Sequence, residues 1–229
     1  LVFADIVEKE AGIPVLCHTA GEFRYRAPVL GAGDVLVAVS QSGETADTLE
    51  AARLARARGA YVIAVTNIGC SSLASLADFL LVMRAGAEIA VAATKSYNCQ
   101  LLCLYYLAGQ MLFFKEERLP SWWGSLERLP AAAEASFGCF AEVDRLADRL
   151  HGARAMYYLG RGLDLCTARE GALKVKEIAR VFAEGYAAGE LKHGSLALIE
   201  EHFPVVCIST GASLAKKSEN ALAEVKSRG

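Results

Sequence analysis

One short polar segment could bind an anion: Ser40-Gln41-Ser42-Gly43-Glu44-Thr45. It follows an apolar run and precedes a segment with helical features, so it leads into a helix N-terminus. Backbone N–H groups there have no partners within the helix, and the helix dipole adds positive potential. Serine and threonine hydroxyls add donors, and Gly43 would let a ligand approach the backbone. These features suit a phosphate monoester, whereas the lack of a lysine excludes a nucleotide P-loop.

The same segment also fits a capped helix start that binds nothing. Glu44 and Asp47 place negative charge close to the hydroxyls. They oppose anion binding unless their carboxylates point away from the ligand. The residue types alone do not choose between the two interpretations.

Three charged residues farther along could act together, because Glu170, Lys174 and Glu177 share one helical face. Spacing alone favours a solvated ladder of ion pairs. The functional alternative is a carboxylate whose charge state is set by the lysine. His193 lies in a glycine-flanked segment that suits a site loop or plain polar surface. A carboxylate and a histidine can move protons on a sugar, although the sequence does not bring them together.

Strands alternate with helices along the chain, which predicts a parallel, doubly wound sheet that binds ligands at the carboxyl ends of its strands. Nearly continuous apolar runs indicate strands buried on both faces. The expected strands are 34–40, 61–66, 79–83, 155–159 and 204–208. The expected helices are 1–11, 46–58, 88–114, 131–150 and 166–182, with a last helix at the end of the chain.

Two lobes are expected, residues 1–120 and 131–229, on either side of a proline- and tryptophan-containing segment. Residues 35–53 and 205–222 share one plan of strand, serine-containing turn and helix, which indicates a weak internal repeat. The strand spacing of the second lobe places the opening strand of the first roughly a dozen residues before Leu1. The second lobe likewise lacks counterparts of 61–114. We therefore expect both lobes to be truncated.

Composition narrows the class of protein. The chain has 229 residues, is 54% hydrophobic and carries a net charge of −2, with no basic block that would favour nucleic acid. Its most apolar stretch, 101–114, is shorter than the ~20 residues of a membrane span. Seven cysteines without a Cys-x-x-Cys pair and four dispersed histidines indicate neither disulfides nor a metal site. Free thiols favour a reducing cytoplasm.

Several segments in a fixed order resemble the sugar isomerase (SIS) domains of the glutamine–fructose-6-phosphate aminotransferase family, the glucosamine-6-phosphate synthases. The resemblance covers nearly the whole chain, and the last segment is particular to the synthases. The matching segments are 21–26 (GEFRYR), 40–48 (SQSGETADT), 87–95 (AEIAVAATK), 170–178 (EGALKVKEI) and 186–194 (YAAGELKHG).

The resemblance implies roles for individual residues. Val91 matches a position whose backbone contacts the sugar. Glu177 resembles the base that moves a proton between C1 and C2, and Lys174 matches a lysine near the reacting end. His193 resembles the group that assists ring opening, supplied in the family by the neighbouring subunit. The residues that resemble phosphate ligands are Ser40, Gln41, Ser42 and Thr45.

The implied reaction condenses ammonia with fructose 6-phosphate and yields glucosamine 6-phosphate, in a cytoplasmic homodimer without a metal or organic cofactor. The family's glutaminase domain, its first substrate loop and its C-terminal lysine have no counterpart here, and Ser195 replaces a usual proline. We therefore expect this chain alone to be inactive. The alternatives are a stand-alone SIS-family phosphosugar isomerase or deglycase and a sugar-phosphate sensor. A sensor would not need both Glu177 and His193.

Overall fold

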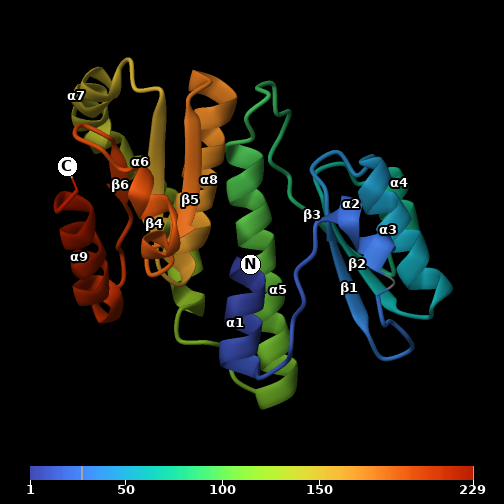
Figure 1. Ribbon diagram of the computed structural model, residues 1–229. Helices are drawn as coiled ribbons and strands as arrows, with labels where there is room; N and C mark the ends of the chain where they lie inside the picture. Colours follow the sequence, from blue (N-terminus) through green and yellow to red (C-terminus); the bar gives the residue numbers. More distant parts are fainter. Residues whose placement is uncertain (27, 229) are drawn as a thin grey trace. The chain divides into compact units, whose positions relative to one another are not determined.

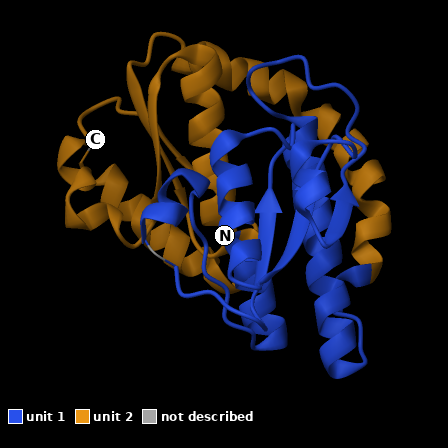
Figure 2. Ribbon diagram, turned by 90° about the vertical axis from the view of Figure 1, so that its right-hand side faces the viewer, with its two compact units in different colours: residues 1, 3–123 blue, residues 2, 124–229 orange. Residues whose placement is uncertain are grey.

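The computed structural model describes residues 1–26 and 28–228 (Figure 1). The chain divides into two compact units, one of residues 1 and 3–123 and the other of residues 2 and 124–229 (Figure 2). We call them unit 1 and unit 2. Each contains a parallel sheet with helices beside it, which confirms the predicted α/β fold class.

The sheet of unit 1 has three parallel strands in the order β1 (Val35–Val39), β2 (Tyr61–Thr66) and β3 (Phe79–Val82). Val39 is paired with Val65 at the end of β1, and Val82 with Thr66 at the end of β3. The three strands therefore finish at one edge of the sheet, where three loops emerge. Those loops are residues 40–45, 67–71 and 83–94.

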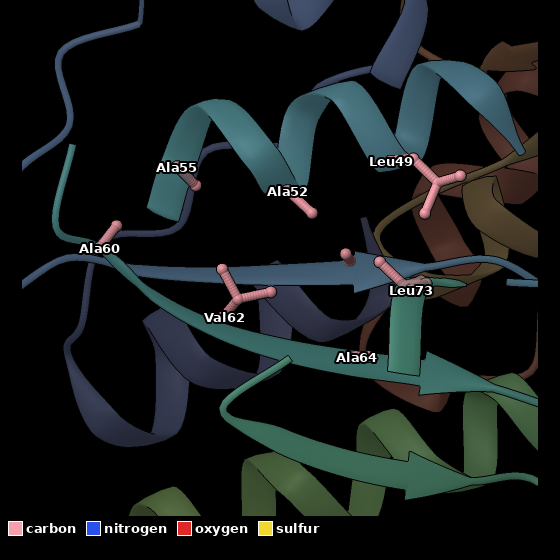
Figure 3. Packing of buried hydrophobic residues seen from close by; sticks show 8 residues of the cluster. Leu49, Ala52, Ala55, Ala60, Val62, Ala64 and Leu73 are labelled. Atoms are coloured by element: carbon pink, nitrogen blue, oxygen red, sulfur yellow. The ribbon is translucent and has the colours of Figure 1, made fainter. Parts of the chain in front are cut away.

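Helix α3 (Ala46–Ala57) packs its alanines on this sheet (Figure 3). Ala52 and Ala55 are fully buried together with Val62 and Ala64 of β2, and the small side chains let helix and sheet approach closely. Strand β2 is buried along five of its six positions, as its apolar run predicts. Strands β1 and β3 were expected to be buried on both faces, but Val35 and Phe79 are about half exposed. In the described residues β1 and β3 each pair with one strand only, so they are edge strands.

The helix predicted over 88–114 begins later than expected. Helix α5 spans Lys95–Glu116, and residues 88–94 form a loop. The reason is the side chain of Glu88, which accepts hydrogen bonds from the backbone N–H (3.0 Å) and hydroxyl (2.7 Å) of Ser96. Glu88 thus bonds a first-turn N–H of α5 from outside the helix, as a capping side chain does.

Other helices of unit 1 complete its layers. The predicted first helix is α1 (Val2–Ala11), which ends at Gly12 with a left-handed φ of 61°. Two short helices, α2 (Ala20–Phe23) and α4 (Ser72–Leu76), were not predicted because each is too brief to show a 3.6-residue pattern.

Unit 2 has a second parallel sheet, ordered β5 (Phe182–Ala187), β4 (Ala155–Gly160) and β6 (Val205–Cys207). Helix α8 (Leu163–Ala179) connects β4 to β5, and α9 (Ala212–Lys226) follows β6. The predicted helix 166–182 was therefore too long at its end, and β5 was missed. Glu184 and Gly185 interrupt the apolar pattern of this strand, while Arg180 ends α8 in a left-handed conformation (φ 55°). The predicted helix 131–150 is split into α6 (Leu129–Ser136) and α7 (Phe140–Leu150).

Candidate functional site

The serine-rich turn joins the end of β1 to the start of α3, as predicted. Ser40 is buried, and its Oγ lies 2.8 Å from Oγ1 of Thr45. The backbone N–H of Gly43 donates to the same Ser40 oxygen at 3.1 Å. Ser40 therefore joins the start of the turn to Gly43 and Thr45, and these hydrogen bonds hold the other donors in place.

Two hydroxyls of the turn are better placed for a ligand. Ser42 is partly exposed, and its Oγ accepts the N–H of Glu44 at 3.2 Å, which leaves the hydroxyl proton free to be donated. Thr45 is exposed at the N-cap of α3 and makes no side-chain capping bond. The first N–H groups of α3 are therefore not capped by this residue. Ser42, Thr45 and these N–H groups form one set of donors suited to an anion.

The two nearby acidic residues are engaged by protein groups. Glu44 accepts the N–H of Ser72 at 2.7 Å, in the first turn of α4. This hydrogen bond lowers the pKa of the Glu44 carboxyl. The carboxylate of Asp47 lies 3.9 Å from the guanidinium of Arg24. Both carboxylates thus have a protein partner, Glu44 in α4 and Asp47 in Arg24.

Gly43 also has a packing role within the protein. Its φ is +67°, and a Cβ at this position would lie 2.2 Å from Oγ of Ser71 and 2.9 Å from Oγ1 of Thr66. The glycine therefore permits close packing against the protein itself. This packing requirement is separate from the expected approach of a ligand to the backbone of Gly43.

Neighbouring residues that were not predicted support the turn. The carbonyl of Gln41 accepts the backbone N–H of Asn67 at 3.0 Å and the hydroxyl of Thr66 at 3.3 Å. The side chain of Asn67 in turn bonds the loop 83–94, which contains Val91. Val91 is 93% exposed, at the same edge of the sheet as the turn. The pair Thr66-Asn67 ends a buried strand with polar residues, as Ser40 does, and this signal could have identified it.

In unit 2 the predicted charged face forms a compact group. Nζ of Lys174 lies 2.7 Å from Oε2 of Glu177 and 3.3 Å from Oε1 of Glu170. The three side chains are only 25%, 28% and 23% exposed, so they are less solvated than a surface ladder. Burial acts to lower the pKa of Lys174, but the bonds to Glu177 and Glu170 and their charges outweigh it, and the pKa is raised. Lys174 is therefore a cation at neutral pH.

Glu177 and His193 lie in different connections of unit 2, Glu177 near the end of α8 and His193 in the segment between β5 and β6. Helix α8 leaves the carboxyl end of β4 and returns toward the start of β5, as Figure 1 shows. Glu177 comes about 14 residues after the helix start, which corresponds to roughly 21 Å along the axis. Lys176 beside it is paired with Glu184, near the start of β5, at 3.3 Å. His193 instead follows β5, exposed in the short 3-10 helix Leu191–His193.

Surface hollows do not coincide with the predicted residues. One of about 420 Å³ is found at the amino ends of β1 and β2 and includes Asp34 and Arg56. Another of about 410 Å³ is found beside β5 and includes Arg169 and Glu190. Neither is lined by a predicted site residue. Within residues 1–26 and 28–228, no helix is long and apolar enough to cross a membrane, and no three His, Cys, Asp or Glu residues are grouped to hold a metal ion.

Comparisons with known proteins agree on one family. The profile of the SIS domain matches residues 1–109 and 149–229. Glutamine–fructose-6-phosphate aminotransferase [isomerizing] of Clostridium acetobutylicum is 45% identical over 98% of this chain and 38% of its own length. The same enzyme of Symbiobacterium thermophilum is 45% identical over 100% of this chain and 38% of its own length. The chain thus spans less than half the length of these curated relatives.

Solved structures resemble the chain as well. The C-terminal domain of glucosamine-fructose-6-phosphate aminotransferase from Francisella tularensis has a TM-score of 0.96 and 34% identity, covering 100% of this chain and 66% of that one. The glucosamine-6-phosphate deaminase structure from Thermotoga maritima has a TM-score of 0.82 and 25% identity, covering 100% of this chain and 69% of that one. Both comparisons extend over both units.

Proposed function

Because this chain belongs to the SIS domain family, we propose that it is the sugar-phosphate-binding, isomerising part of a glutamine–fructose-6-phosphate aminotransferase. The observation that carries the proposal is the turn between β1 and α3. Its hydroxyl and N–H donors lie together, while Glu44 and Asp47 are engaged elsewhere. Such a set of donors suits a phosphate monoester. The substrate would be fructose 6-phosphate and the product glucosamine 6-phosphate.

In this proposal the phosphate is bound by the turn and the sugar extends toward the loop of Val91. Ser42 and Thr45 donate their hydroxyls to phosphate oxygens, and the N–H groups of α3 add the helix dipole. Ser40 shapes the turn by accepting the N–H of Gly43, and the side chain of Gln41 completes the set of phosphate ligands. The exposed backbone at Val91 contacts the sugar.

The proposed chemistry moves one proton between adjacent carbons. Ammonia condenses at C2 of the open-chain ketose to give an imine, with release of water. Glu177 then removes a proton from C1 and returns it to C2, while the imine nitrogen gains a proton and the C1 hydroxyl loses one, which gives the 2-amino aldose. Lys174, held as a cation 2.7 Å from Glu177, places a positive charge at the reacting end. That charge stabilises the negative charge that develops on the sugar oxygen as the proton moves.

Ring opening is assigned to His193 of the partner subunit in a cytoplasmic homodimer. Within one chain, Glu177 lies near the end of α8, before β5, and His193 lies in the segment after β5. A site shared between two subunits would bring a histidine from one chain to the carboxylate of the other. The assignment to the partner rests on the resemblance of residues 186–194 to the aminotransferase family.

Calorimetric titration of the chain with fructose 6-phosphate tests the binding step. We expect binding that requires the phosphate, so fructose should give no signal. Ser42→Ala should weaken binding at least about tenfold, the loss of one charge-assisted hydrogen bond. Ser213→Ala, the same change at an exposed position of α9, is the matched control and should bind normally. Equal affinity for fructose, or no effect of Ser42→Ala, would contradict the proposal.

The isomerisation step is tested in the complete aminotransferase that contains this chain. We expect Glu177→Gln to lower the isomerisation rate at least about 100-fold, the usual contribution of a general base. Substrate affinity should change little, because the glutamine keeps the size of the side chain. Glu142→Gln, at an exposed position of α7, is the control. Full activity in Glu177→Gln would show that another residue moves the proton.

A further inference from the structure

We propose that Asn67 is a positioning residue that holds the sugar-contacting loop against the phosphate-binding turn. The inference deepens the proposed function and rests on it. Asn67 directly follows β2, the central strand of unit 1, and lies between the other two loops at the carboxyl edge. None of the family motifs in the sequence contains it.

Asn67 bonds both neighbouring loops at once. Its backbone N–H donates to the carbonyl of Gln41 in the turn at 3.0 Å. Its side-chain Nδ2 donates to the carbonyl of Gly86 at 2.7 Å, and its Oδ1 accepts the N–H of Ala85 at 2.8 Å. One residue thus joins the turn through its backbone and the loop 83–94 through both ends of its amide.

The loop needs such support because its conformation is unusual. Arg84 and Gly86, on either side of Ala85, both have left-handed φ values of 53° and 70°. A non-glycine residue in this region is uncommon and persists where its surroundings hold it. Farther on, Glu88 bonds the N–H groups of Thr94 and Ser96 at the start of α5. Val91 therefore lies on a segment held by Asn67 on one side and by Glu88 on the other.

The two kinds of bond made by Asn67 can be separated experimentally. The turn is held by a backbone N–H, which remains in every variant except proline, and by the hydroxyl of Thr66. The loop is held by the side chain alone. Removal of the side chain should therefore free the loop and leave the phosphate-binding turn intact. The expected signature is a loss of sugar recognition without a loss of phosphate recognition.

The test compares Asn67→Ala with Asn220→Ala, the same change at an exposed position of α9. Amide hydrogen exchange by NMR reports on the loop. We expect faster exchange at Ala85 and along 83–94 in Asn67→Ala, with residues 40–45 unchanged. Titration should show about tenfold weaker binding of fructose 6-phosphate and unchanged binding of inorganic phosphate. Asn220→Ala should match the wild type in both measurements.

The outcomes separate this inference from the proposed function. Unchanged loop exchange, or equal losses for phosphate and sugar phosphate, would overturn the positioning role. If the wild-type chain binds neither compound, the proposed function fails, and the exchange measurement alone decides whether Asn67 holds the loop. If Asn67→Ala does not fold, Asn67→Asp replaces it. That variant keeps the acceptor for Ala85 and lacks the donor to Gly86, so its loop should still exchange faster at residues after 86.

Discussion

Thr210 donates two hydrogen bonds to the buried carboxylate of Asp164, one from its backbone N–H (2.9 Å) and one from its hydroxyl (2.6 Å). Asp164 is in the first turn of α8, and Thr210 is in the turn between β6 and α9. The two strand-to-helix turns at the carboxyl edge of unit 2 are thus tied together. In unit 1 the turn after β1 is tied to the next turn through Gln41, whose carbonyl accepts the N–H of Asn67.

Asp164→Ala should destabilise the chain. It would remove two bonds to a charged acceptor and leave both donors of Thr210 without this partner, at a cost of about 2–4 kcal/mol in the free energy of unfolding. Urea unfolding followed by circular dichroism measures the change. Asp148→Ala, at an exposed position of α7, should have an effect below about 0.5 kcal/mol. Similar stabilities for the two variants would show that the bonds to Thr210 contribute little.

Gly43→Ala should also lower stability, for a steric reason. The new methyl group would lie far inside contact distance of Ser71, at a backbone φ of +67° that alanine disfavours. We expect a loss of about 2–4 kcal/mol in the free energy of unfolding. Gly31→Ala is the matched control, since nothing lies within 4 Å of a Cβ there and its φ is not left-handed. An equal effect of both changes would rule out the close contact as the cause.

Acid should weaken unit 1 through the carboxylates that bond helix starts. The hydrogen bonds to Ser96 lower the pKa of Glu88 below its ordinary value of 4.5. A lowered pKa in the folded state contributes stability above the unfolded value, and this stability is lost as the pH falls through the folded pKa. Glu88→Gln should therefore show a smaller loss of stability between pH 7 and pH 3 than the wild type. Thermal unfolding across this range measures it, with Glu142→Gln as the control. Parallel pH profiles for wild type and Glu88→Gln would argue against the assignment.

Lys174 should couple more strongly to Glu177 than to Glu170, because its Nζ lies 2.7 Å from the first and 3.3 Å from the second. Double-mutant cycles with Lys174→Met and each glutamate changed to glutamine measure the two coupling energies. We expect roughly 1 kcal/mol for the pair with Glu177 and less for the other, since all three side chains are partly exposed. Stronger coupling to Glu170 would mean that Lys174 forms its main ion pair with Glu170.

Sequence patterns predicted best those elements in which nearly all residues are buried to the same extent. Strand β2 begins and ends at the predicted residues because all but one of its positions are buried, and the buried positions before Thr66 are apolar. Strand β5 was missed because Glu184 and Gly185 interrupt its apolar pattern. β5 is an outer strand of its sheet, where polar and small residues are tolerated. The start of α5 was misplaced for a different reason. Glu88 looks helical by composition, yet its carboxylate bonds the N-terminus of the helix.

The sequence by itself determined the family, the parallel α/β fold and the polar residues of the turn, because these follow from short segments and their order. Only the tertiary structure decided what each of those residues does. Glu44 bonds the N–H of Ser72 in α4, and Ser40 accepts the N–H of Gly43. Asn67 bonds each neighbouring loop, through its backbone N–H to Gln41 and through its side chain to Gly86. The bonds of Glu44 and Asn67 join residues far apart in the chain, and no local pattern records which partner a polar group will find.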